Sequence, residues 1–249
     1  MLIDTDEEFA KAPITEAIIE FRVATPDDVT ITALKSLEQT LGDRYPKVAQ
    51  QVHRTVGVQL AEGDAPQAKV ESESESIRFE TEDGHYVAQL RPNSFSFSVM
   101  APYKNWAEFT AEAQAVWEKY LEIAKPISIV RIATRFINVV QIPKADVIDY
   151  DDYFTAGPKV PDGLPQTISG FLSRVIIVNG EIGAYAIVTQ TVEPPTESFL
   201  PYILDIDVIS EKQFDARDGA YWVQLEQLRH FKNDIFRRSI TKKAKDLFR

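Results

Sequence analysis

The chain has 249 residues, 44% of them apolar, no cysteine and a formal net charge of −11. This composition predicts a globular protein with a substantial core, and the lack of cysteine excludes disulfide bonds and thiolate catalysis. The acidic N-terminus and the lack of a long apolar run argue against a signal peptide and a transmembrane helix, so we expect a cytoplasmic protein with no membrane contact.

The first half of the chain, residues 1–125, is expected to begin with a strand over 14–23, where apolar and polar residues alternate. Further strands are expected between residues 50 and 100. Residues 71–76 alternate Glu and Ser, so a strand there would have a glutamate face and a serine face, and neither face belongs in a core. We interpret this segment as a projecting hairpin arm or a mobile loop. A long amphipathic helix, capped by Asn105, closes this half.

The second half, residues 126–249, shows the same order of elements. A long apolar strand is expected over 127–142, and Asn179-Gly180 predicts a hairpin between two further strands. Another alternating strand follows, and then an amphipathic helix over 219–236. The similarity of the halves predicts an internal duplication.

This pattern predicts an α+β fold of two pseudo-repeated halves that form one antiparallel, curved sheet with its helices on one face. The other face would be open, and it is either an ordinary solvent-exposed sheet surface or a binding surface. Within each strand, the residues that alternate with the apolar ones belong on this open face. Five of them are candidate binding residues: Arg22, Arg131, Arg135, Asp205 and Asp207.

A basic segment ends the chain, with seven Lys or Arg residues and two Asp residues between positions 232 and 249. Arg237, Arg238, Lys242 and Lys243 are therefore further binding candidates. Two interpretations stay open: a solvated helix end whose cations suit the helix dipole, or a docking face for an acidic partner or nucleic acid.

No catalytic signature stands out in the sequence. Asp205 and Asp207 would project from one face of a strand, where paired carboxylates can bind a divalent cation or perform acid–base work, but spacing identifies no third ligand. The chain has no phosphate-binding glycine loop and no nucleophile motif. We therefore expect no cofactor and no metal, and we leave enzymatic activity uncertain, with a non-enzymatic role favoured.

Three segments carry a resemblance to a known family. They are residues 12–21, the strand Phe95-Ser96-Phe97-Ser98 before a tryptophan-bearing helix, and residues 225–241 with Asn233-Asp234-Ile235-Phe236 and Ser239-Ile240-Thr241. The chain resembles a sporadically distributed prokaryotic family of proteins of about this length and of unassigned function. The resemblance carries over no catalytic residue. Such a distribution implies mobile accessory genes, including toxin–antitoxin or phage-defence neighbourhoods.

We therefore predict a non-enzymatic accessory or regulatory protein that binds a protein partner or forms a homodimer. One alternative is a nucleic-acid-binding or phage-defence/toxin–antitoxin factor that uses the open face and the basic segment. The other is a small-molecule enzyme that uses Asp205, Asp207 and the arginines of the neighbouring strands.

Overall fold

The computed structural model describes the backbone of residues 9–59 and 67–249, and their side chains except at 53–59 and 67–74. The elements of the first half are, in chain order, β1 (Ile14–Ala24), α1 (Ile31–Lys35), α2 (Glu38–Leu41), β2 (Lys47–Gln59), β3 (Gln67–Glu80), β4 (Tyr86–Arg91), β5 (Ser94–Met100) and α3 (Trp106–Ala124). Those of the second half are β6 (Ser128–Pro143), η1 (Tyr150–Asp152), β7 (Leu172–Asn179), β8 (Ala184–Val192), β9 (Phe199–Ser210), β10 (Phe214–Asp215), α4 (Ala220–Ser239), α5 (Lys242–Lys245) and η2 (Asp246–Phe248).

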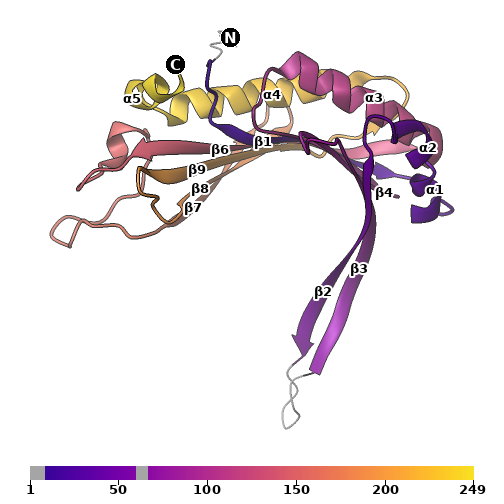
Figure 1. The fold of residues 1–249 in the computed structure, drawn as a ribbon, viewed down its shortest axis with the longest axis horizontal. Helices are drawn as coiled ribbons and strands as arrows, with labels where there is room; N and C mark the ends of the chain where they lie inside the picture. Colours follow the sequence, from indigo (N-terminus) through magenta and orange to yellow (C-terminus); the bar gives the residue numbers. More distant parts are fainter. Residues whose placement is uncertain (1–8, 60–66) are drawn as a thin grey trace.

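The strands form one antiparallel sheet in the order β2-β3-β4-β5-β1-β6-β9-β8-β7, and β10 pairs with β6. Figure 1 shows the sheet bending beneath α3 and α4, which lie on the same face. The predicted α+β class and the antiparallel sheet are confirmed. Within the described residues, no helix is both long enough and apolar enough to cross a membrane.

The central strand β1 confirms the predicted alternation. Ala17, Ile19 and Phe21 are buried, whereas the residues between them face the open side. The ring of Phe21 lies 4.8 Å from that of Trp117 on α3 and 5.6 Å from that of Tyr221 on α4, measured between centroids. One aromatic cluster therefore joins the sheet to both long helices.

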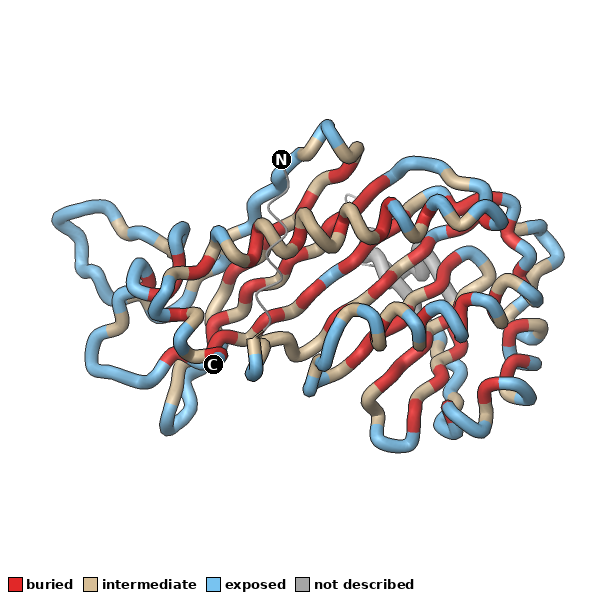
Figure 2. Tube along the Cα trace, turned by 90° about the horizontal axis from the view of Figure 1, so that it is seen from above, coloured by how far each residue is buried: buried red, intermediate tan, exposed pale blue. Residues whose placement is uncertain are grey.

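Both long helices were predicted from their apolar stripes. Asn105 caps α3, as expected, because its side chain accepts a hydrogen bond of 2.8 Å from the Glu108 amide. Figure 2, viewed from above, shows buried residues along the strands that these helices cover. The indole Nε1 of Trp117 donates a buried hydrogen bond of 2.9 Å to the Tyr221 hydroxyl, which connects α3 to α4.

Strands β2 and β3 form an arm that extends away from the rest of the sheet, as Figure 1 shows. The Glu-Ser segment at 71–76 lies in β3, and the side chains of residues 71–74 lie outside the described residues. Ser76 is fully buried at the base of the arm and accepts a hydrogen bond of 3.0 Å from Gln89 Nε2. The expectation that the whole segment avoids the core is therefore wrong at Ser76, because β4 continues the sheet there.

Candidate functional site

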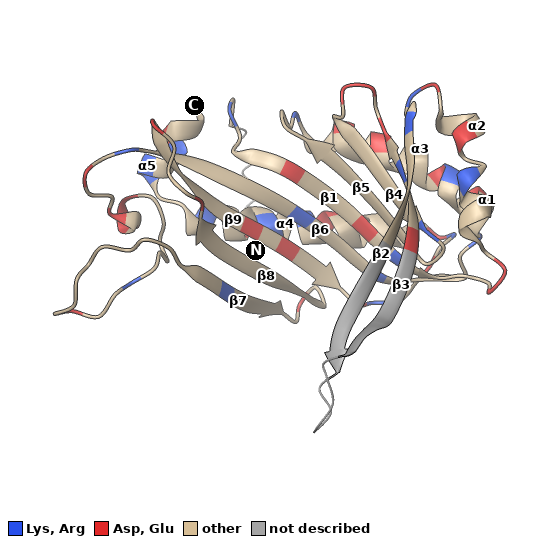
Figure 3. Cartoon of the chain, turned by 60° about the horizontal axis from the view of Figure 1, so that its bottom comes forward, with Lys and Arg blue, Asp and Glu red and all other residues tan. Residues whose placement is uncertain are grey.

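The open-face candidates lie on three adjacent strands, β1, β6 and β9. Arg22 is opposite Arg131 in the register of β1 and β6, and Arg135 is opposite Asp207 in that of β6 and β9. Figure 3 shows acidic and basic residues on neighbouring strands of this part of the sheet. The structure therefore brings the five open-face candidates into one surface cluster.

Ion pairs neutralise the arginines of this cluster. Arg131 Nη1 lies 2.6 Å from Glu20 Oε1, and Arg22 Nε lies 3.1 Å from the same oxygen. Arg135 donates two hydrogen bonds to Asp205, of 2.8 Å and 2.6 Å. In this cluster of described residues the arginines are therefore paired with carboxylates, and the cluster lacks the excess positive charge that a phosphate backbone requires.

Asp207 differs from the other charged groups of the open face. Its side chain is half-buried, and burial raises its pKa to about 6, against the opposing effect of Arg131 and Arg135. A carboxyl group with such a pKa can take up or release a proton near neutral pH.

The four C-terminal candidates lie elsewhere, at the end of α4 and on α5 (Figure 1). Arg237 pairs with Asp234 at 3.0 Å, and Lys243 pairs with Asp152 at 2.6 Å. Arg238 and Lys242 are exposed. The structure therefore does not unite the basic segment with the open-face cluster.

Strand β7 is a feature that the sequence pattern did not single out as a surface. Large apolar side chains are exposed along its whole length: Leu172 75%, Val175 48%, Ile176 59%, Ile177 38% and Val178 77%. Among the described strands, β7 is hydrogen-bonded to β8 alone and ends the sheet. The strand therefore combines a free edge with two uncovered apolar faces.

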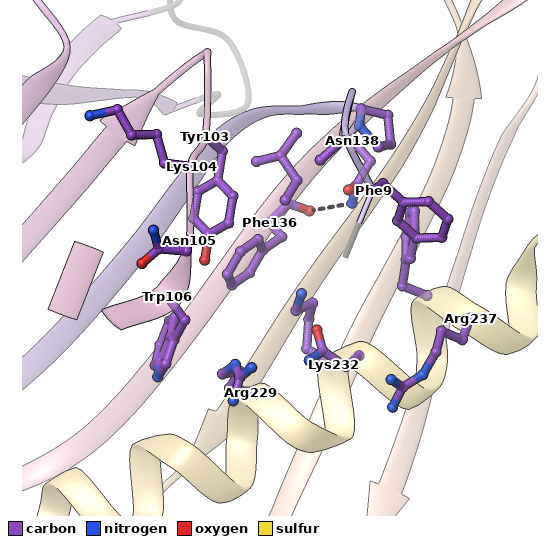
Figure 4. A pocket seen from close by; sticks show the side chains of 15 residues that line it. Phe9, Tyr103, Lys104, Asn105, Trp106, Phe136, Asn138, Arg229, Lys232 and Arg237 are labelled. Atoms are coloured by element: carbon purple, nitrogen blue, oxygen red, sulfur yellow. Dashed lines mark hydrogen bonds between the residues drawn. The ribbon is translucent and has the colours of Figure 1, made fainter. Parts of the chain in front are cut away.

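A pocket, here called the α4 pocket, lies between α4, the start of α3 and the sheet (Figure 4). Its walls include Tyr103, Trp106 and Phe136, and its floor is closed by strands β1 and β6. Lys232 extends from α4 toward Phe136, and its Nζ lies 3.7 Å from the centroid of that ring. Burial, and then the nearby Arg229 and Arg237, lower the pKa of Lys232 to about 7.

Sequence reasoning assigned Lys232 only to the basic segment. It lies four residues after Leu228 and four before Phe236, both of which are buried, so helical spacing places it on the apolar face of α4. That helical spacing is the signal in the sequence that could have placed Lys232 on the buried face of α4. Among the described residues, no group of three His, Cys, Asp or Glu side chains is arranged to hold a metal ion.

No protein-family model matches the sequence, and no curated protein matches it. The resemblance described above therefore stays a prediction.

Proposed function

We propose that this is a non-enzymatic accessory or regulatory protein of the cytoplasm, and that it acts by binding protein through the β7 edge. The observation that carries the proposal is the apolar, unpaired strand β7. An edge strand exposes a row of backbone N–H and C=O groups that can bind another strand.

The protection that edge strands usually carry is nearly absent from β7. Charged residues, prolines and bulges normally prevent edge-to-edge pairing, whereas Arg174 is the one charged residue of β7 and no proline occurs in it. Both faces of the strand bear exposed apolar side chains, with Val175 and Ile177 on one face and Ile176 and Val178 on the other. This composition is typical of a strand inside a sheet.

The two ends of the sheet also differ. In the first half, β3 is followed in the sheet by β2. In the second half, β7 occupies the corresponding third position outward from the β1–β6 pair, and no described strand follows it. The position beside β7 is therefore open to a strand from outside the chain.

We assign this position to β7 of a second copy of the chain. A two-fold axis perpendicular to the sheet pairs β7 with itself in antiparallel register and keeps each face continuous. Centred on Val175, such an axis sets Arg174 opposite Ile176; centred on Ile176, it sets Arg174 opposite Val178. In neither register do like charges meet, and apolar pairs form on both faces.

Molar mass in solution tests this assignment. We expect light scattering at micromolar concentration to give twice the mass of one chain, and Ile176→Lys to give a monomer. Val223→Lys is the matched control, because Val223 is 65% exposed on α4, close to the 59% of Ile176, but lies away from the sheet edge. A monomeric wild-type protein, or an Ile176→Lys variant that stays dimeric, would contradict the proposal.

The nucleic-acid alternative has weaker support. Its open face carries paired charges, and Arg237 and Lys243 face carboxylates, so Arg238 and Lys242 are the exposed cations that favour it. Binding of a labelled duplex that weakens steeply with salt would support it. The small-molecule enzyme alternative rests on Asp207, the carboxyl group with the raised pKa.

We also propose that residues 1–125 and 126–249 are pseudo-repeats within one compact unit. The sheet order supports this, because β5, β4 and β3 follow outward from β1 as β9, β8 and β7 follow outward from β6. An experimental structure in which the halves superpose, with α3 on α4, is the test. Halves whose helices cross their strands in different directions would contradict it.

A further inference from the structure

Lys232 is a buried cation with no counter-ion among the described residues. The residue is 7% exposed, and no described group accepts a hydrogen bond from its side chain or forms an ion pair with it. Its ammonium group makes a cation–π contact with the ring of Phe136. Lysine is almost never buried without a partner, because removing an ammonium group from water is costly. The surroundings of the Lys232 ammonium group therefore favour a bound anion.

The surroundings of Lys232 favour an anion as well. Apart from the phenol of Tyr103, the ionisable groups among the described residues that line the α4 pocket are all cationic, and they come from α4 and the β5–α3 connection: Lys104, Arg229, Lys232 and Arg237. Three of these cations pair with carboxylates that are not among the described lining residues: Lys104 with Glu108, Arg229 with Glu226, and Arg237 with Asp234. Lys232 is the one that forms no ion pair with a described residue. Strands β1 and β6 contribute no ionisable group. The first turn of α3, a helix of 19 residues, adds the positive end of its dipole at this rim.

The walls of the pocket indicate the size and shape of the uncharged part of an anion that would bind there. Trp106 is held in place, because its Nε1 donates a hydrogen bond of 2.5 Å to Glu226 and Arg229 lies over its ring at 5.7 Å. Phe136 and Tyr103 pack edge to face at 5.8 Å. The cavity measures about 130 Å³, close to the roughly 150 Å³ of a cavity that accepts benzene. A flat body of one ring fits this space.

We propose that the α4 pocket binds a small organic anion of single-ring size, whose carboxylate or phosphate group pairs with Lys232 and whose ring packs among Tyr103, Trp106 and Phe136. The amide of Asn233 also lines the pocket, and among the described residues its side chain makes no hydrogen bond, so it is available as a second donor. This site uses no residue of β7 and does not depend on dimerisation.

Calorimetric titration of the full chain with benzoate and with phenyl phosphate at pH 6.5 tests the proposal, with neutral benzyl alcohol as the matched uncharged probe. We expect at least one anion to bind, benzyl alcohol to bind at least tenfold more weakly, and Lys232→Met to lose at least tenfold in affinity for the anion. Lys242→Met removes an exposed cation from α5 and is expected to leave the affinity unchanged. Thermal unfolding of Lys232→Met verifies that the variant is folded.

Two further titrations test whether Lys232 is the group that binds the anion. Affinity for the anion is expected to fall as the pH rises from 6.5 to 9, because burial lowers the pKa of Lys232 to about 7 and Lys232 loses its proton in this range. The second arm replaces Asp4, Asp6, Glu7 and Glu8, which precede the lining residue Phe9 in the sequence, with Asn and Gln. Binding of neither anion to the wild-type protein, equal binding by Lys232→Met, or binding seen only after those four replacements would each overturn the proposal.

Discussion

Arg135 on β6 binds Asp205 on β9 through two parallel hydrogen bonds, Nε to Oδ1 at 2.8 Å and Nη2 to Oδ2 at 2.6 Å. The strand register sets Arg135 opposite Asp207, so the guanidinium reaches diagonally to Asp205 instead. Within the described residues, Asp207 accepts no side-chain hydrogen bond. The two carboxylates on this face of β9 therefore affect stability in opposite ways: the Asp205 carboxylate is paired, whereas the Asp207 carboxylate is poorly solvated.

Asp207→Asn is expected to stabilise the protein at neutral and alkaline pH. Burial raises the Asp207 pKa from 3.8 to about 6, so between these values the folded protein binds more protons than the unfolded chain. The free energy of unfolding therefore falls as the pH rises through this window. The full difference corresponds to about 3 kcal/mol, and partial contact with water reduces our expectation to about 1–2 kcal/mol. Urea denaturation at pH 8 and pH 4 is the measurement, and the gain should vanish at pH 4.

Asp205→Asn is expected to have the opposite effect on the same strand. It removes a two-pronged ion pair and leaves Arg135 without its partner, at a cost of about 1 kcal/mol in the free energy of unfolding. Denaturation at low and high salt measures the loss, which should shrink as salt screens the pair. Equal stability of Asp205→Asn and wild type would show that the pair contributes nothing.

Lys232→Met is expected to stabilise the fold most strongly at acidic pH. The Lys232 pKa is about 7 in the folded protein and 10.5 in the unfolded chain, so between these values the unfolded chain binds more protons. Stability of the wild type therefore rises with pH across this window, and the penalty is fully present below pH 7. The contact with Phe136 offsets part of the penalty. We expect a gain of about 2 kcal/mol at pH 6, and little gain near pH 10. A pH-independent gain would show that Lys232 is neutral throughout.

The sequence pattern predicted the elements whose burial depends on local alternation. In β1, Ala17, Ile19 and Phe21 face the core as expected, and Asn105 begins α3. These predictions succeeded because a strand or helix with one apolar face has a single way to bury it.

The features that the sequence pattern missed depend on contacts between distant segments. Whether an apolar strand such as β7 lies inside a sheet or at its edge is decided by strand order, which alternation does not encode. Lys232 was assigned to a basic segment because charge runs are usually solvated, whereas tertiary packing buries it under α4. The separation of Arg238 on α4 and Lys242 on α5 from the open face has the same origin, because these helices lie on the other side of the sheet.

Tyr221→Phe is expected to lower the free energy of unfolding by about 1–3 kcal/mol, because it leaves the buried Trp117 N–H without an acceptor. This bond joins the helices of the two halves, so its loss tests whether they form one cooperative unit. Urea denaturation followed by Trp fluorescence and by circular dichroism is the measurement. Tyr185→Phe is the matched control, since its hydroxyl contacts Glu211 at the surface and should change stability by less than about 0.5 kcal/mol. Two separate transitions in wild type would contradict a single unit.

The register of the proposed β7 pair can be read by cysteine cross-linking, because the chain has no cysteine of its own. On a two-fold axis a residue meets its own copy, with Cβ atoms about 4.5–5.5 Å apart, near the range in which a disulfide can form. We expect Val175→Cys or Ile176→Cys, but not both equally, to form a cross-linked dimer under mild oxidation. Val178→Cys is the control: it is the most exposed apolar position of β7, at 77%, yet in either register it lies at least four residues from its own copy along the strand. Equal cross-linking at all three positions would indicate random collision, and none at any of them would contradict the paired edge.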